Sequence, residues 1–146
     1  MATRILVVDD EQDMVDLLTY SLKERGYEVV SARNGLEAVH KARSFQPDCV
    51  LLDLMLDGMD GFTVCEILRH QPSTVNLPVI MVTALVGEMP RLNGFDSGAD
   101  DFITKPFNVE ALMQRMEKVL EKRRRRCLEV EEARDWAGRK VVSKAA

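Results

Sequence analysis

Five polar side chains follow short apolar stretches of the chain, each close to the point where a stretch ends. They are Asp9, Asp10, Asp53, Thr83 and Lys105. If these stretches are parallel strands, their carboxyl ends share one edge of a sheet, and the carboxylates, the hydroxyl and the ammonium meet there. Stability does not readily explain such a gathering, because unpaired buried charges are costly. The alternative is a surface charge cluster that happens to fall at strand ends.

Three carboxylates in one pocket repel one another unless a cation or Lys105 offsets their charge. A divalent metal offsets it best, and oxygen ligands without His or paired Cys favour Mg²⁺, with Mn²⁺ as the second choice. With metal bound, the side chains suit phosphoryl transfer, in which positioning and charge neutralisation supply most of the catalysis. Asp53 is then the nucleophile, and Thr83 and Lys105 each serve one oxygen of the incoming group.

The elements that would position these residues alternate along the chain, because short apolar stretches are followed by segments of helical period. This alternation predicts an α/β fold in which parallel strands are joined by helices. The predicted strands are residues 5–8, 28–31, 49–54, 79–83 and 101–104. The predicted helices are residues 11–25, 35–44, 61–69, 90–97 and a last one from 109 onward. With right-handed crossovers, these units form a doubly wound five-stranded parallel sheet with helices on both faces.

Local signals support these boundaries. Apolar residues recur at helical spacing in residues 11–25, and Gly26 is placed to end that helix. Pro90 suits the first turn of the fourth helix, where its missing N–H is harmless. Gly94 weakens that helix, and Asn108 can cap the last one. The third strand is apolar nearly throughout, which predicts a central position covered on both faces.

The composition is that of a globular protein with one domain of ordinary size. Of the 146 residues, 46% are hydrophobic and 30% are charged. Residues 1–120 carry 11 basic and 19 acidic side chains, a balance of −8, whereas residues 121–146 carry 9 and 5, a balance of +4. An acidic body disfavours direct nucleic-acid binding. The apolar runs are too short to span a bilayer and no signal segment opens the chain, so we expect a cytoplasmic protein that does not enter the membrane.

Six motifs resemble the receiver domains of response regulators in two-component signalling. They are ILVVDDE at residues 5–11, LLDLM at 51–55, GMDGF at 58–62, VTA at 82–84, GADDF at 98–102 and TKPF at 104–107. The match covers about residues 3–122 and recurs in order at the predicted strand ends. The resemblance implies a flavodoxin-like fold with strand order 2-1-3-4-5 and a receiver domain over residues 1–122. It also implies a cis peptide bond between Lys105 and Pro106.

The resemblance assigns roles to the polar residues at the strand ends. It implies that Asp53 accepts a phosphoryl group from a sensor histidine kinase or a histidine phosphotransfer protein. It also implies that Asp10 and Asp53 hold Mg²⁺ together with the backbone carbonyl of Met55, with Asp9 acting largely through water.

The same resemblance implies a switch. Phosphorylation adds charge and acceptor oxygens, Thr83 moves toward the phosphoryl group, and Phe102 rotates inward. The surface of the fourth helix, fifth strand and fifth helix then changes shape. Phe102 has no hydroxyl to hold its inward state, so packing must hold it; the alternative is an ordinary core aromatic. Met55 and Leu85 are apolar and orient no attacking water, so we expect the aspartyl phosphate to outlast that of a Met55→Asn variant.

Residues 123–146 form a basic C-terminal extension, into which the last predicted helix could continue. Four arginines at residues 123–126 interrupt the apolar stripe of that helix. Such a run is usually a solvated face that opposes the helix dipole. The alternatives are a docking patch for an acidic partner, a membrane-surface contact and a linker toward an output domain. The extension is too short to fold as an output domain itself.

Three classes of function remain open on the sequence. The first is a stand-alone receiver that signals to a downstream protein, and the second is the receiver part of a longer regulator; homodimerisation on phosphorylation is common in the family. The third is a phosphate hydrolase with an aspartyl intermediate, which needs a second acid or base beside the nucleophile. Asp53 is followed by Leu54 and Met55, which argues against a hydrolase. We therefore expect a phosphoacceptor protein that is not an enzyme.

Overall fold

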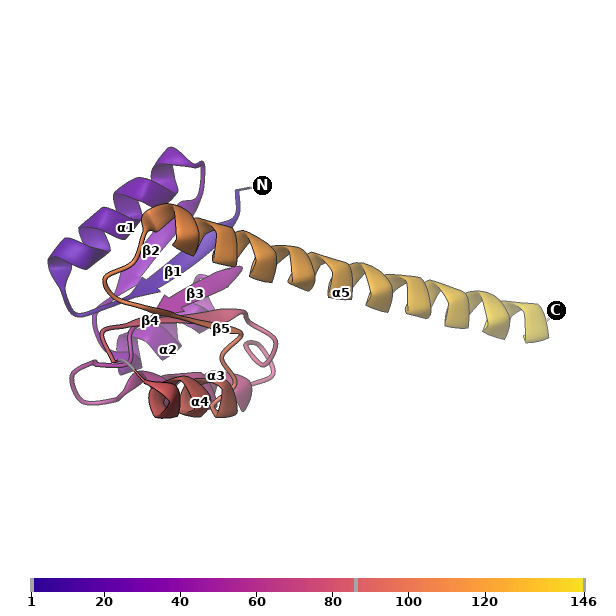
Figure 1. The fold of residues 1–146 in the computed structure, drawn as a ribbon. Coiled ribbons are helices and arrows are strands. Elements are labelled where there is room, and N and C mark those ends of the chain that lie inside the picture. Colours follow the sequence, from indigo (N-terminus) through magenta and orange to yellow (C-terminus); the bar gives the residue numbers. More distant parts are fainter. Residues whose placement is uncertain (1, 86, 146) are drawn as a thin grey trace.

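The computed structural model describes residues 2–85 and 87–145, with side chains described as far as residue 138. Its strands are β1 Arg4–Val8, β2 Glu28–Ala32, β3 Cys49–Leu52, β4 Val79–Thr83 and β5 Asp101–Thr104. They form one parallel sheet in the order β2-β1-β3-β4-β5 (Figure 1). The predicted doubly wound sheet and its strand order are confirmed, so all five carboxyl ends lie along the same edge.

Helices cover both faces of the sheet. Within the described residues they are α1 Gln12–Glu24, α2 Gly35–Ser44, α3 Gly61–Arg69, α4 Glu88–Asp96 and α5 Val109–Ala145. α1 and α5 lie on one face, and α2, α3 and α4 lie on the other (Figure 1). Each face buries its own apolar cluster, with Leu18 and Leu112 in one and Val64 and Leu68 in the other.

The central strand β3 is buried throughout, as its apolar sequence predicts. Its side chains alternate between the two clusters: Leu51 packs on the α1 and α5 side, and Leu52 on the opposite side. The strand was predicted to run to Leu54 but ends at Leu52. The Asp53 N–H still donates to the carbonyl of Val8 (2.9 Å), and the chain then turns so that the Leu54 carbonyl accepts the Gly61 N–H (3.0 Å).

α4 begins two residues earlier than predicted, at Glu88. Gly87 precedes it with a φ of 113°, a conformation open mainly to glycine. Pro90 remains in the first turn, as predicted. Glycine at 87 thus lets the chain turn sharply into the helix before the proline.

α5 continues well beyond the sheet (Figure 1). Asn108 accepts the N–H of Glu110 (2.8 Å), which satisfies a free donor at its start as predicted. Among the side chains described, Leu120 is the last buried one on the helix, and from residue 124 to residue 138 every side chain is exposed. The helix passes the proposed domain boundary after residue 122 without a break. Within the described residues, no helix is both long and apolar enough to cross a bilayer.

Candidate functional site

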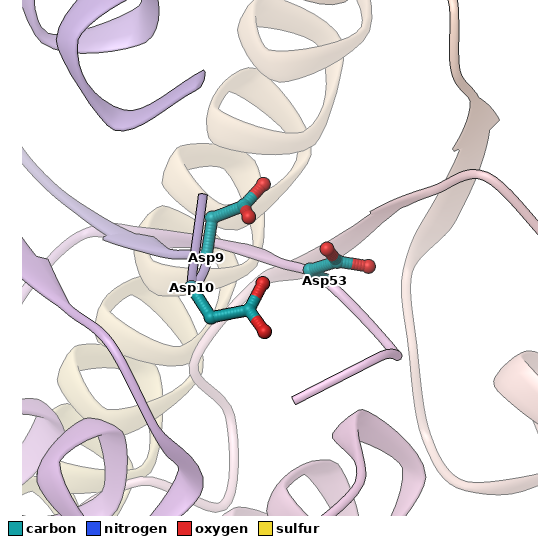
Figure 2. Close-up of side chains that lie close together, drawn as sticks. All are labelled: Asp9, Asp10 and Asp53. Atoms are coloured by element: carbon teal, nitrogen blue, oxygen red, sulfur yellow. The ribbon is translucent and has the colours of Figure 1, made fainter. Parts of the chain in front are cut away.

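Three carboxylates meet at the carboxyl edge of the sheet (Figure 2). Asp9 and Asp10 follow β1, and Asp53 follows β3. One oxygen from each side chain lies within 4.8 Å of an oxygen of the other two. Asp9 is 3% exposed and Asp53 is 4% exposed, whereas Asp10 is only partly buried. Two of the three negative charges therefore lie almost entirely out of solvent.

Local backbone bonds orient the two buried carboxylates in the same way. The Glu11 N–H donates to Oδ1 of Asp9 (2.9 Å), and the Met55 N–H donates to Oδ1 of Asp53 (3.2 Å). In both cases the donor lies two residues after the aspartate, so the turn that ends the strand also fixes the carboxylate. The two Oδ2 atoms are left to face Lys105.

Lys105 lies between these two carboxylates. Its Nζ is 2.8 Å from Oδ2 of Asp9 and 3.2 Å from Oδ2 of Asp53. It directly follows β5, and its N–H donates to the carbonyl of Thr83 (2.7 Å), which ties this turn to the end of β4. The bond between Lys105 and Pro106 is cis, as the resemblance implied.

The electrostatic balance of the pocket is negative. Burial raises the pKa of the Asp9 carboxyl above its usual range, and the bonds from Lys105 and Glu11 only partly oppose this effect. Burial alone would lower the pKa of Lys105, but the hydrogen bond to Asp9 and the charge of Asp53 outweigh it, and the pKa is raised. The pocket thus holds three carboxylates and one ammonium, which contacts two of them, so negative charge is left uncompensated.

The donor set fits a hard divalent cation. The three residues that converge offer only carboxylate oxygens, the ligand type that Mg²⁺ and Mn²⁺ prefer. Asp57, another nearby acid, lies exposed in the turn at Gly58 and outside this cluster of described residues. An exposed position of this kind is typical of a solvated Asp-Gly turn.

Thr83 ends β4, Phe102 lies within β5, and both side chains are buried. The Thr83 hydroxyl accepts the N–H of Leu85 (3.3 Å), and among the described residues no hydrogen bond joins it to Asp53. Phe102 is 7% exposed and packs in the cluster on the α2, α3 and α4 side. The ring therefore occupies an inward position in this structure.

Gly61 is a residue of the site to which the sequence pattern gave no role. A Cβ at this position would lie 2.5 Å from the carbonyl oxygen of Asp53 and 2.8 Å from the Cα of Leu54. Asp60 caps α3 by accepting the Thr63 N–H (2.8 Å). Glycine thus allows α3 to begin directly against the loop that carries Asp53. The GMDGF motif contains this residue, but only the three-dimensional contact explains it.

The sequence matches the family model of the response regulator receiver domain over residues 5–117. The chain belongs to this family. It is therefore a receiver domain of two-component signalling, and its carboxylate pocket lies where the family motifs place the strand ends.

Curated relatives share the receiver part of this chain. It is 45% identical over 117 residues to the DNA-binding dual master transcriptional regulator RpaA of Synechocystis, a match that covers 80% of this chain and 48% of the relative. It is 47% identical over 116 residues to the response regulator PleD of Caulobacter vibrioides, covering 80% of this chain and 26% of the relative. The chain thus spans half or less of the length of these relatives.

Solved structures of receiver domains superpose on most of the chain. A response regulator from Chloroflexus aurantiacus aligns with a TM-score of 0.79 at 35% identity, over 83% of this chain and 99% of that one. A CheY-like receiver domain from Methanospirillum hungatei aligns with a TM-score of 0.81 at 27% identity, over 86% and 99%. The shared part is the receiver domain itself, since these structures are aligned over almost their whole length.

Proposed function

We propose that this receiver domain accepts a phosphoryl group on Asp53, in a reaction that depends on Mg²⁺ or Mn²⁺, and uses the added charge as a reversible switch. The observation that carries the proposal is the convergence of Asp9, Asp10 and Asp53, two of which, Asp9 and Asp53, also pair with the ammonium of Lys105. The phosphoryl donor is a sensor histidine kinase or a histidine phosphotransfer protein, since response regulators as a class interact with such proteins.

Each side chain of the pocket has a distinct task in this proposal. An oxygen of Asp53 attacks phosphorus, and the P–N bond of the donor phosphohistidine breaks as the new O–P bond forms. Asp10, Asp53 and the carbonyl of Met55 would hold the divalent cation, with Asp9 acting largely through water, and the ion would neutralise phosphoryl oxygens. Lys105 and the Thr83 hydroxyl donate to the remaining oxygens. In this structure the Thr83 hydroxyl accepts the Leu85 N–H, which leaves its own hydrogen available to donate.

The protein is proposed to be a phosphoacceptor and not a hydrolase of external phosphate esters. The chain places Met55 two residues after Asp53, and this side chain is 56% exposed and apolar. It offers no acid or base that would activate water. We therefore expect slow loss of the phosphoryl group and no turnover of an added ester.

The signalling surface proposed here consists of α4, β5 and α5. Movement of Thr83 and Phe102 would change this surface and with it the contact to a downstream protein, an output domain or a second copy of the chain. The acidic body disfavours nucleic acid as the direct partner. We propose that the part of α5 beyond residue 122 serves as a linker from the receiver domain at residues 1–122. We also propose that the protein is located in the cytoplasm.

The proposal is tested by incubating the protein with a small phosphodonor and measuring its intact mass. The parent should gain the mass of one phosphoryl group in the presence of Mg²⁺, and chelation should prevent the gain. Asp53→Asn should gain nothing. Asp57→Asn is the matched control, because it removes an exposed carboxylate four residues away, and it should behave as the parent. Equal mass gain in Asp53→Asn and the parent would refute Asp53 as the acceptor.

A further inference from the structure

α4 rests on the sheet through a single buried residue. All nine residues of the helix are described; seven are exposed, Pro90 is partly buried and Gly94 is buried. The apolar side chains of Met89, Leu92 and Phe95 are 66%, 48% and 39% exposed. Much of the apolar surface of these side chains thus faces solvent, and the only fully buried residue of the helix, Gly94, has no side chain.

Two side chains of the sheet lie directly under Gly94. Met81 of β4 and Phe102 of β5 are register partners, so they stand side by side on the same face. A Cβ at Gly94 would lie 2.9 Å from Sδ of Met81 and 3.3 Å from Cδ2 of Phe102. Met81 is fully buried. The space normally filled by a Cβ is therefore taken by the thioether and by the edge of the Phe102 ring.

The two ends of α4 are held differently. At its C-terminal side, the guanidinium of Arg69 donates to the carbonyl of Gly98 (2.9 and 2.7 Å), and the Ser97 hydroxyl donates to the carbonyl of Asn93 (2.8 Å). At its N-terminal side, Gly87 provides no side-chain cap. The helix is therefore fastened at one end, and its middle is positioned by the contact at Gly94.

We propose that Gly94 is the contact through which the position of the Phe102 ring sets the position of α4. The helix approaches the sheet as closely as it does because no Cβ separates it from that ring. A change in the position of the Phe102 ring changes the surface on which α4 rests. Met89, Leu92 and Phe95 then move with the helix. The proposal deepens the proposed function, on which its signalling role rests, but the steric coupling itself is a property of the unphosphorylated protein.

The coupling is tested by hydrogen exchange of the α4 amides in Gly94→Ala, without any phosphodonor. Alanine is the better helix former, so helix propensity alone predicts slower exchange. Steric coupling predicts the opposite, several-fold faster exchange, because the added methyl group lifts the helix from Met81 and Phe102. Gly138→Ala is the matched control: a Cβ there meets nothing within 4 Å, so α4 exchange should stay at the parent rate.

A double-mutant cycle with Phe102→Leu shows whether the ring carries the effect. In the Phe102→Leu background the ring edge is gone, and of the two side chains under Gly94 only the flexible Met81 thioether, which can shift, stays close to the added methyl group. Gly94→Ala should therefore change α4 exchange far less than it does in the parent. If Gly94→Ala alone does not fold, the comparison is made between Phe102→Leu and the double variant that carries both substitutions. Unchanged or slower exchange in Gly94→Ala, or equal acceleration in both backgrounds, would overturn the proposal. Mass gain on Asp53 is measured separately, so a failed coupling and a failed phosphoacceptor are distinguishable.

Discussion

At the scale of single residues, the pocket holds more buried negative charge than its one lysine neutralises. The imbalance affects the Asp9 carboxyl, whose pKa is raised, mainly by burial. A carboxyl with a raised pKa in the folded state gives stability in its protonated form. That stability is lost as the pH rises from about 3.8, the ordinary pKa of the carboxyl, through its raised pKa in the folded protein. Near neutral pH, ionised Asp9 is therefore expected to destabilise the metal-free fold.

Asp9→Asn should raise the free energy of unfolding of the metal-free protein by roughly 1 kcal/mol. The amide can still accept the Glu11 N–H, and Lys105 retains Asp53 as its partner. Urea unfolding at neutral pH with a chelator measures the change. Asp57→Asn, at an exposed turn, serves as the control, and a loss of stability in Asp9→Asn would contradict this description of the pocket.

Lys105→Met should have the opposite effect and lower the free energy of unfolding by about 3 kcal/mol, because it leaves buried carboxylates without a counter-charge. Because the pKa of Lys105 is raised, its contribution to the free energy of unfolding is complete below about pH 10.5, the ordinary pKa of a lysine. That contribution is lost as the pH rises through the raised pKa. The variant should therefore lose less stability than the parent between neutral and strongly alkaline pH. Lys118→Met, at an exposed position of α5, controls for loss of a lysine. Parallel pH profiles for Lys105→Met and the parent would argue against the ion pairs.

Met55→Asn should shorten the lifetime of the aspartyl phosphate. An amide next to the acceptor can orient a water molecule, which the thioether does not, so the rate of phosphoryl loss should rise by about threefold to tenfold. Met55 is exposed, so the exchange should not disturb the core. Loss of label from phosphorylated protein measures the rate, and equal or slower loss in the variant would reject the role of this position.

At the scale of elements, the start of α3 is packed directly against the loop that carries Asp53. Gly61→Ala would bring a methyl carbon within 2.5 Å of a backbone oxygen, which cannot rotate away as a side chain can. We expect a loss of roughly 2 kcal/mol in the free energy of unfolding and slower phosphoryl uptake. Gly138→Ala on the exposed part of α5 gives the matched control. Parent-like stability and uptake in Gly61→Ala would show that the loop yields without consequence.

The elements whose sequence carries a strong period were predictable, and those fixed by close contacts were not. The apolar run of β3 predicted a central buried strand, and Gly26 and Asn108 marked helix ends that the structure confirms. The start of α4 was missed, because it depends on the backbone conformation of Gly87. Gly94 was expected only to weaken its helix, and its contact with Phe102 depends on how α4 meets the sheet, which local pattern does not contain.

The candidate site was predictable as a set of residues but not as a geometry. Topology brings strand ends to one edge, so Asp9, Asp10 and Asp53 were expected to meet. The sequence could not give the distances from Lys105 to two of these carboxylates. Nor could the sequence show that the Thr83 hydroxyl accepts a hydrogen bond from the Leu85 N–H in this structure.

At the scale of the whole molecule, an acidic receiver body carries a long, basic helical extension that is exposed from residue 124 to residue 138. Arg123 is the first arginine of the run at residues 123–126, and it donates to the carbonyl of Asp48 (2.8 Å). It therefore joins the extension to the body, whereas the next three arginines are exposed and two of them pair with Glu121. The solvated-face interpretation thus describes most of the run but not its first member.

The central claim is that the three carboxylates share a pocket because a divalent cation binds among them and prepares Asp53 for modification. The most direct test is the urea unfolding midpoint of the intact protein with Mg²⁺ and with a chelator. Binding to the folded state alone should raise the free energy of unfolding, by about 2.7 kcal/mol at a Mg²⁺ concentration one hundred times the Kd. Asp10→Asn should lose most of this increase. Identical unfolding curves with and without Mg²⁺ would contradict the claim.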